Sequence, residues 1–370
     1  MTVTLRPGRL TGEIAAMPSK SDLHRLMIGA WLAGIDIDQL PVISEDIEAT
    51  RDCLLTENGV LNCRESGSTL RFLLPVMAAL GKSVTFTGEG RLPERPMQPL
   101  IDLLRAHGCE VSDAQLPITI SGQLKPGQYE LPGDVSSQYI TGLLFSLPLL
   151  RGNSEIVLIS PLESAGYVEM TLRTLSRFGI VVQSTPTGWH IPGGQNYQPP
   201  ALPLTPEGDW SNAAFWLAAG VRMTGLDESS AQPDRVIAQL LKNHAEMDAS
   251  QCPDLVPIMA VVMATRLGES RIFNAARLRI KESDRLAAMA QNLNAIGADV
   301  TELPDGLIIR GKDALRGGEV QSFGDHRIAM AMAIAARKCE GSVVLHGAEA
   351  VAKSYPEFWA DYQRLGGQYE

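Results

Sequence analysis

The chain has 370 residues, of which 45% are hydrophobic and 20% charged, a composition typical of an ordinary folded protein. The 32 Lys and Arg residues stand against 42 Asp and Glu residues, so the formal net charge is −10 at pH 7 and an overall basic surface for nucleic acid is excluded. Any site for an anion must therefore be local. The N-terminal residues hold no apolar signal core, and no apolar run approaches the roughly 18 residues that a membrane span needs. We expect a cytoplasmic protein of two or three domains.

The cysteines and histidines do not indicate a metal or a disulfide framework. The five cysteines are odd in number, widely spaced and without a C-x-x-C pair, and the six histidines lack H-x-x-x-H and H-E-x-x-H spacing. The chain also lacks a P-loop and a dinucleotide fingerprint, so we expect no cofactor. These residues are Cys53, Cys63, Cys109, Cys252, Cys339, His24, His107, His190, His244, His326 and His346.

Six segments are apolar on nearly every side over the length of a helix, and each ends on or near a glycine. Helices without a polar face are buried ones. Several of them run into strand-like stretches such as SVTFTG and SVVLHG. In chain order they are LHRLMIGAWLAG, STLRFLLPVMAALG, QYITGLLFSLPLLRG, NAAFWLAAGVRMTG, DLVPIMAVVMATRLG and HRIAMAMAIAARKCEG.

A second set of six segments is amphipathic and alternates with the first set. The chain thus reads as six copies of a buried helix, a strand, an exposed helix and a strand or hairpin, with three copies per domain and a boundary near Asp227. The copies are uneven, and the two shortest intervals follow the first and the fourth amphipathic segment. The amphipathic segments are RDCLLTENGV, PLIDLLRAHGCEV, MTLRTLSRFGIVV, VIAQLLKNHAEM, MAQNLNAIGADV and EFWADYQRLGG.

The starts of the buried helices carry cations that the helix dipole disfavours. Serine and aspartate are frequent N-caps, so capping explains each of them singly. Capping does not explain Lys20, Arg71 and Arg327, whose charge opposes the dipole in the first turn. An anion bound between these cations and the helix N–H groups removes the conflict. The starts are marked by Lys20 and Ser21; Ser66, Gly67, Ser68 and Arg71; Ser136, Ser137 and Gln138; Asp209 and Ser211; Asp254; and Asp325, His326 and Arg327.

Two further basic clusters lie outside these helices, GRLPERP at residues 90–96 and RLRIKESDR at residues 277–285. A solvated charge run explains either cluster equally well, and Lys353 reads by default as a surface lysine. If the buried helices converge, these cations converge with them and bind a small polyanion that carries phosphate and carboxylate groups. The remaining chemistry is acid–base catalysis on anions. Its candidates are Asp254, Glu282, Asp325, His326 and the lysines.

Eight segments, in order from residue 17 to residue 359, resemble the signature motifs of the 5-enolpyruvylshikimate-3-phosphate synthase family. The resemblance implies two similar α/β domains, each of three βαβαββ-type repeats with the helices inside, an inside-out α/β barrel. It places residues 1–17 and 227–370 in one domain and residues 18–226 in the other, with the active site in the cleft between them. The segments are PSKSDLHR, ESGSTLR, RLPERP, DVSSQYITGLL, EGDWSNAAFWLAA, LRIKESDRLAAMA, FGDHRIAMA and AKSYPEFW.

The activity implied by the resemblance is transfer of the enolpyruvyl group of phosphoenolpyruvate to the 5-hydroxyl of shikimate 3-phosphate. Phosphate leaves through a tetrahedral ketal, on the shikimate pathway to the aromatic amino acids. The resemblance further implies a monomer that needs no cofactor and binds neither nucleic acid nor membrane. Members of the family are targets of the inhibitor glyphosate.

The resemblance also assigns roles to single residues. Asp254 takes the proton from the attacking hydroxyl, Glu282 donates a proton to the methylene carbon and Lys20 assists. A carboxylate among cations is readily ionised, so Glu282 is expected to need a relayed proton, and which group delivers it stays open. Contacts to shikimate 3-phosphate fall to Lys20, Ser21, Arg25, Ser136, Ser137, Gln138, Ser164, Tyr167, Asp254 and Lys281. Contacts to phosphoenolpyruvate fall to Lys20, Gly67, Arg95, Gln138, Arg285, Arg327 and Lys353.

The chain departs from the family pattern in three ways. Phe72 replaces a common proline, which bears on the response to glyphosate, and Arg277 replaces a common asparagine, which bears on how shikimate 3-phosphate is held. The chain is also shorter than typical members, and we expect the first and fourth repeats to lack a strand or hairpin.

Two alternatives remain. UDP-N-acetylglucosamine enolpyruvyl transferase usually has a reactive cysteine in the loop that corresponds to GEGRLPERP, which has none in this chain. A non-catalytic relative that binds phosphorylated ligands should have lost Asp254, Glu282 or Lys20, and all three are present.

Overall fold

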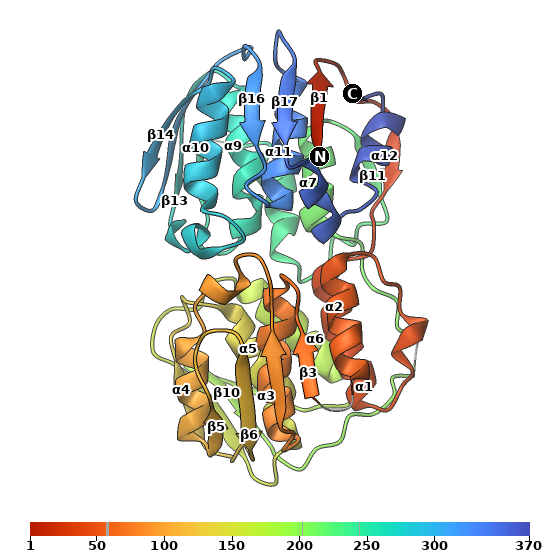
Figure 1. Ribbon diagram of the computed structural model, residues 1–370, viewed down its shortest axis with the longest axis vertical. Coiled ribbons are helices and arrows are strands. Elements are labelled where there is room, and N and C mark those ends of the chain that lie inside the picture. Colours follow the sequence, from red (N-terminus) through yellow and green to blue (C-terminus); the bar gives the residue numbers. More distant parts are fainter. Residues whose placement is uncertain (57–58, 202, 244) are drawn as a thin grey trace. The chain divides into compact units, whose positions relative to one another are not determined.

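The structure, a computed structural model, describes residues 1–56, 59–201, 203–243 and 245–370 (Figure 1). His244 and small parts of the expected helices RDCLLTENGV and VIAQLLKNHAEM lie outside the described residues.

The chain forms two compact units. Unit 1 combines Met1–Ser19 with Glu207–Glu370, and unit 2 is Lys20–Pro206. The second crossing between the units thus comes before residue 207 and not near Asp227. The reason is the fourth buried helix, α7 (Trp210–Ala218), whose aromatic side chains pack into the apolar core of unit 1.

The six apolar segments all form helices that are buried along most of their length. Every residue of α9 and α11 is buried, so neither helix has a solvent-facing side. The prediction that one set of helices lies inside is therefore confirmed. Unit 2 holds α1 (Lys20–Leu32), α3 (Gly67–Ala79) and α5 (Ser137–Ser146); unit 1 holds α7, α9 (Val256–Ala264) and α11 (His326–Ala336).

The amphipathic segments form the outer helices. The fourth of them, α8, is shorter than expected, because a 3₁₀ turn at Pro233–Val236 precedes it and the helix ends at Leu240. The outer helices are α2 (Glu45–Leu55), α4 (Gln98–Ala106), α6 (Ala165–Arg177), α8 (Ile237–Leu240), α10 (Arg285–Ala295) and α12 (Phe358–Arg364).

Each unit carries two four-stranded sheets of one design, in which the first strand pairs parallel with the second and the other pairs are antiparallel. In unit 2 the orders are β3 (Gly59–Asn62), β4 (Val84–Thr87), β6 (Ile118–Gly122), β5 (Cys109–Val111), and β7 (Gln128–Leu131), β8 (Ser154–Leu158), β10 (Gly188–Ile191), β9 (Gln183–Thr185).

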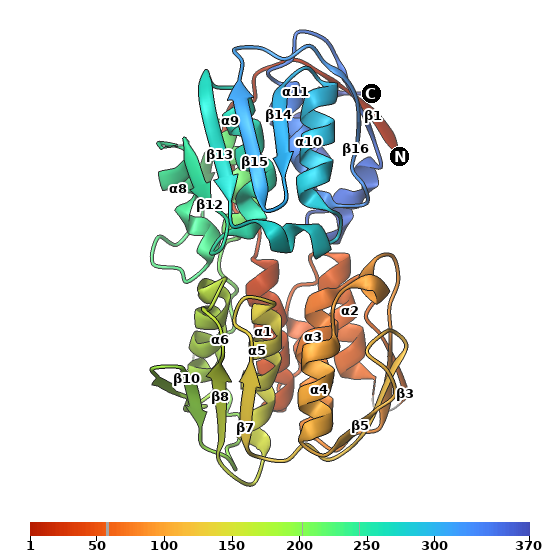
Figure 2. The same ribbon diagram turned by 90° about the vertical axis from the view of Figure 1, so that its left-hand side faces the viewer.

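One sheet of unit 1 combines the N-terminal strand with three strands from the C-terminal part of the chain. The N-terminal strand β1 lies between β17 and β18, where the other sheets place a strand of their own repeat. In Figure 2 the strands β13, β15 and β14 lie side by side, with α10 next to β14. The orders are β12 (Glu246–Asp248), β13 (Gly268–Phe273), β15 (Gly306–Gly311), β14 (Asp299–Leu303), and β16 (Gly318–Gln321), β17 (Val343–His346), β1 (Thr2–Arg6), β18 (Gln368–Tyr369).

The first and fourth repeats are the reduced ones, as expected. Between α1 and α2 the described chain forms one 3₁₀ turn, Ile37–Gln39, and no strand. The fourth repeat has β11 (Arg222–Thr224), which pairs parallel with β2 (Glu13–Ala15), and the single strand β12 after α8, where the described residues form no hairpin. The strands therefore form separate sheets around the inner helices and do not join into a closed barrel within the described residues.

Each unit encloses its own apolar core. None of the helices in the described part of the chain is long and apolar enough to cross a membrane.

Candidate active site

Arg285, the first residue of α10, is the centre of an ionic network in unit 1. Its side chain is 1% exposed. Its Nη1 donates to Asp254 Oδ1 at 2.7 Å, its Nη2 to Glu282 Oε2 at 2.9 Å and its Nε to Asp325 Oδ2 at 2.8 Å. Asp325 is the N-cap of α11, and Asp254 lies in the 3₁₀ turn before α9, so the starts of two buried helices meet at one guanidinium.

Asp254 is held by a second arginine as well. Arg327 Nη2 donates to Asp254 Oδ2 at 3.1 Å, and Arg327 lies in the first turn of α11. Burial opposes ionisation of Asp254, but the positive charges of Arg327, Lys281 and Arg285 outweigh it and hold the pKa of this carboxyl well below its usual range. Asp254 is therefore ionised at neutral pH.

A second buried carboxyl, that of Asp234, is close enough to Asp254 to be affected by its charge. It is 0% exposed and accepts a hydrogen bond from the hydroxyl of Ser211 in the first turn of α7. Burial, together with the negative charge of Asp254, raises its pKa to about 7. The two neighbouring carboxyls thus have pKa values shifted in opposite directions.

Lys353 completes the unit 1 group. Its Nζ donates to the carbonyl oxygen of Gly324 at 2.7 Å, in the turn that leads into α11. The structure therefore gathers all of the residues assigned to substrates in this unit around the starts of α9, α10 and α11. These residues are Asp254, Lys281, Glu282, Arg285, Arg327 and Lys353.

In unit 2, Lys20 is the first residue of α1. Its Nζ lies 2.7 Å from Asp46 Oδ2 on α2, and both side chains are largely buried. The conflict between Lys20 and the helix dipole is thus balanced in part by a carboxylate.

The starts of α3 and α5 are joined by a glutamine. Arg71 Nη1 donates to Gln138 Oε1 at 2.7 Å, and Gln138 Nε2 donates to Ser68 Oγ at 2.9 Å. Arg71 is also 5.7 Å from the ring centre of Tyr139. Arg71 therefore orients Gln138, one of the expected substrate contacts.

Gly67 opens α3 against two guanidinium groups. A Cβ atom at this position would lie 2.7 Å from Arg95 Nη1 and 2.8 Å from Arg71 Nη1, both closer than real Cβ contacts allow. The absence of a side chain at Gly67 thus leaves room for both guanidinium groups beside the start of this helix, and a Cβ atom would displace them.

Arg25 belongs to a second group in unit 2, between α1 and α6. Its Nε donates to Thr171 Oγ1 and its Nη2 to the carbonyl oxygen of Tyr167, each at 2.9 Å. The ring of Phe72 lies below it, 5.3 Å from the guanidinium carbon, so the unusual Phe72 supports an expected binding residue. Burial lowers the pKa of Arg25 to about 10.

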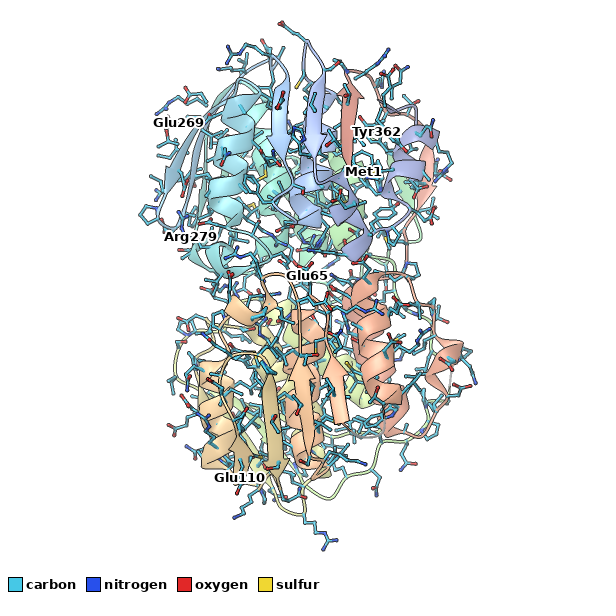
Figure 3. All side chains as sticks on the ribbon, in the orientation of Figure 1. Met1, Glu65, Glu110, Glu269, Arg279 and Tyr362 are labelled. Atoms are coloured by element: carbon cyan, nitrogen blue, oxygen red, sulfur yellow. The ribbon has the colours of Figure 1, made fainter. Side chains whose placement is uncertain are left out.

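The serines assigned to shikimate 3-phosphate mark two helix starts. Ser136 caps α5 by accepting from the N–H of Gln138, and Ser137 is the first residue of that helix. Ser164 precedes α6 with a φ of 55°, a backbone conformation that L-residues rarely adopt. In Figure 3, Glu65, which precedes the α3 start, lies at one end of unit 2, and Glu110 lies at the opposite end.

Several residues of these networks were not singled out by the sequence. Asp46 pairs with Lys20, Asp234 is close to Asp254, and Thr50 connects α1 to α3. Only the position of Asp46 at the start of an acidic helix gave a sequence signal. Arg277, which replaces the common asparagine, donates to the carbonyl oxygen of Ser250 at 2.7 Å and so supports the loop that leads to Asp254.

The model of the family described as EPSP synthase (3-phosphoshikimate 1-carboxyvinyltransferase) matches residues 44–228 and 222–362. The chain belongs to the EPSP synthase family. It is therefore an enzyme, a transferase.

Two relatives named 3-phosphoshikimate 1-carboxyvinyltransferase are each 42% identical to the chain over 419 residues. The relative from Clostridium kluyveri aligns with 100% of this chain and 98% of its own length, and the one from Clostridium acetobutylicum with 99% and 97%. These alignments are longer than the 370 residues of the chain, so the relatives hold residues that have no counterpart in it.

Solved structures share the fold of this EPSP synthase family member. EPSP synthase from Acinetobacter baumannii has a TM-score of 0.81 at 23% identity and covers 100% of this chain and 99% of its own. The enolpyruvyl transferase NikO from Streptomyces tendae has a TM-score of 0.78 at 17% identity, with coverage of 100% and 98%. The inside-out two-domain architecture expected from the sequence is thus confirmed.

Proposed function

We propose that the chain transfers the enolpyruvyl group of phosphoenolpyruvate to the 5-hydroxyl of shikimate 3-phosphate and releases phosphate, as a step of the shikimate pathway. The observation that carries the proposal is the position of Asp254 between Arg285 and Arg327. This arrangement combines a proton acceptor with cations suited to phosphate and carboxylate, and the names of the relatives support the two substrates.

The arginines regulate when Asp254 acts as a base. Because both arginines donate to its carboxylate, Asp254 alone binds a proton weakly. An incoming anion recruits the N–H groups of Arg327 and Arg285, so Asp254 loses part of its stabilisation and its pKa rises toward that of an effective base. Phosphoenolpyruvate therefore activates the group that deprotonates its reaction partner.

Glu282 and Lys281 serve the same step from the segment before α10. Glu282 accepts from Arg285, which fixes its orientation, and it delivers the proton to the methylene carbon after receiving it from a relay. Lys281 polarises the attacking hydroxyl near Asp254, and Lys353 contacts phosphoenolpyruvate.

Unit 2 supplies most of the binding groups. Lys20, Gly67, Arg95 and Gln138 bind phosphoenolpyruvate. Shikimate 3-phosphate is bound by Lys20, Ser21, Arg25, Ser136, Ser137, Gln138, Ser164 and Tyr167.

The reaction requires the two units to act on the same pair of substrates, so we expect them to close when both bind. Small-angle scattering should report a smaller radius of gyration with shikimate 3-phosphate and phosphoenolpyruvate than without them.

A phosphate-release assay with phosphoenolpyruvate tests the reaction. We expect release with shikimate 3-phosphate and none with UDP-N-acetylglucosamine. Release only with the UDP-sugar would replace the proposal by its nearest alternative, and release with neither acceptor would favour a binding protein.

Lys20→Ala tests the site. Loss of a cation that contacts both substrates should lower kcat/KM by at least about 100-fold, the usual cost of losing a preorganised charge at the transition state. Lys82→Ala, at an exposed lysine of the same unit, is the matched control and should retain full activity. Full activity of Lys20→Ala would refute the site.

A further inference from the structure

Two pairs of side chains connect α1 to α2 at successive turns. Lys20 contacts Asp46, and His24 Nδ1 lies 2.7 Å from Thr50 Oγ1. Both pairs are four residues apart on their own helix, so they lie on facing stripes of the two helices. The Lys20–Asp46 pair is ionic, and the His24–Thr50 pair is neutral.

The hydrogen bonds of the His24–Thr50 pair extend to side chains at the start of α3. Thr50 Oγ1 lies 2.6 Å from Thr69 Oγ1, and Thr69 Oγ1 donates to Ser66 Oγ at 2.7 Å. Ser66 is the N-cap of α3 and also accepts from the N–H of Thr69. All four side chains are at most 1% exposed, and we call them the hydroxyl chain: His24, Thr50, Thr69 and Ser66.

Counting hydrogens fixes the direction of the hydroxyl chain. Thr69 has one hydroxyl hydrogen and gives it to Ser66, so a hydrogen between Thr50 and Thr69 must come from Thr50. The Thr50 hydroxyl also donates to the carbonyl oxygen of Asp46 at 3.3 Å, so its single hydrogen is taken by Thr69 or by Asp46. Thr50 then has none left for His24, and the hydrogen in that contact must sit on His24 Nδ1.

The other ring nitrogen agrees with this assignment. His24 Nε2 is buried and has no hydrogen-bond partner among the described residues. Burial, with the positive charges of Lys20 and Arg25, lowers the pKa of His24 well below its usual value, so the ring is neutral. A neutral ring with its hydrogen on Nδ1 leaves only a lone pair at Nε2.

We infer that the hydroxyl chain is a positioning device for phosphoenolpyruvate, which holds the start of α3 at Gly67 in register with Lys20 on α1. The inference rests on the proposed function. His24, Thr50 and Thr69 act through Gly67, which is assigned to phosphoenolpyruvate alone, and do not touch the substrate. The hydrogen bonds of the hydroxyl chain can all form in one direction only. The hydroxyl chain therefore allows one arrangement of α1, α2 and α3 at their starts.

Removal of the Thr50 hydroxyl breaks the chain in its middle. Thr50→Val keeps the shape of the side chain but leaves His24 Nδ1–H without its acceptor, so α1 and α3 lose their common register. We expect the KM for phosphoenolpyruvate to rise about tenfold, which corresponds to about 1.4 kcal/mol, while the KM for shikimate 3-phosphate changes by less than about twofold. Thr50→Ser restores the hydroxyl and should restore the KM.

Thr174→Val is the matched control. Thr174 is a buried threonine of α6 in the same unit, and its hydroxyl donates to the carbonyl oxygen of Met170 at 3.0 Å. This variant should leave both KM values unchanged. An unchanged KM for phosphoenolpyruvate in Thr50→Val, or an equal rise in Thr174→Val, would overturn the inference. Phosphate release by the wild-type protein in the same experiment reports separately on the proposed function.

Nitrogen-15 NMR of the wild-type protein provides a test that needs no variant to fold and no activity. Comparison with His24→Asn assigns the His24 ring signals. We expect Nδ1 to carry the hydrogen and Nε2 to carry none at pH 7. A hydrogen on Nε2, or on both nitrogens, would contradict the direction of the hydroxyl chain and with it the inference.

Discussion

The helix starts of the two units use charge in different ways. In unit 1, Arg285 donates to three carboxylates, and one of these, Asp254, also accepts from Arg327. In unit 2, Arg25 and Arg71 donate hydrogen bonds to neutral oxygens of threonine, glutamine and the backbone, whereas Lys20 pairs with a carboxylate, that of Asp46. Carboxylates can exchange protons, whereas neutral acceptors orient a cation without cancelling its charge. The charges therefore suit acid–base chemistry in unit 1 and anion binding in unit 2.

The largest expected effect concerns the carboxylate of Asp254. Asp254→Asn keeps the shape but removes the proton acceptor, so we expect kcat to fall by about 10²- to 10⁴-fold, the usual contribution of a general base. Steady-state kinetics measure this fall. Asp299→Asn, at a half-exposed aspartate of β14, is the control and should keep the wild-type kcat. Equal kcat values for the two variants would remove acid–base chemistry from unit 1.

The second prediction concerns the contribution of Arg285 and its three carboxylates to the free energy of unfolding. Arg285→Met leaves three carboxylates without their shared cation in a buried place, so we expect the free energy of unfolding to fall by about 3–5 kcal/mol. Arg71→Met, which removes hydrogen bonds to Gln138 and to the carbonyl oxygen of Pro96, should cost only about 1–3 kcal/mol. Urea denaturation of both variants measures the difference. Equal losses would mean that the two helix starts do not differ electrostatically in the way described.

Gly67→Ala tests the binding side. The new Cβ would push Arg95 and Arg71 away from the α3 start, so we expect the KM for phosphoenolpyruvate to rise by about tenfold or more, equivalent to at least about 1.4 kcal/mol. The KM for shikimate 3-phosphate should change little. Gly8→Ala, where nothing lies within 4 Å of the new atom, is the control. A normal KM in Gly67→Ala would show that Arg95 does not need this approach.

A further expected effect is a pH dependence of stability in unit 1. The pKa of Asp234 is raised to about 7 in the folded state against an ordinary value of 3.8, so the folded state holds more protons between these values. The resulting stabilisation is present below pH 3.8 and is lost as the pH rises through 7, by at most about 1.4 kcal/mol per pH unit. Asp234→Asn should remove this slope.

His24 in unit 2 should act in the opposite direction. Its pKa is lowered in the folded state, so its stabilisation is present above the ordinary pKa of 6.5 and is lost as the pH falls below it. Urea denaturation between pH 4 and pH 8, on the wild type, Asp234→Asn and His24→Asn, separates the two contributions. A change of the slope in the same sense by both substitutions would contradict the opposite pKa shifts of Asp234 and His24.

The architecture followed from local patterns, whereas the pairing of charges did not. Apolar periodicity located the six inner helices, and Ser66, Ser136, Asp209 and Asp325 are N-caps as their positions at helix starts suggested. Local sequence cannot show which distant side chains meet. A solvated charge run explained the cluster that contains Arg285 as well as a binding role did, yet Arg285 is buried, because Asp254 and Asp325 contact it from positions 31 and 40 residues away in the chain.

The same limit explains the displaced crossing between the units. The stretch DESSAQPD, residues 227–234, has the composition of a linker. Within it, however, Ser230 and Gln232 donate hydrogen bonds to the side chain of Glu207, the residue at which the chain re-enters unit 1. A polar stretch can either link two units or fasten one of them, and composition does not distinguish these roles. The hydroxyl chain was equally invisible, because its four members come from three helices.

The place of β1 between β17 and β18 has a consequence for synthesis. The inner strand β1 is made before the whole of unit 2, and its neighbours, residues 343–346 and 368–369, are made after unit 2. Unit 2 occupies one continuous stretch and can fold on the ribosome while translation goes on. Unit 1 cannot complete this sheet until residues 368–369 emerge, so β1 must wait unpaired while unit 2 and the rest of unit 1 are made.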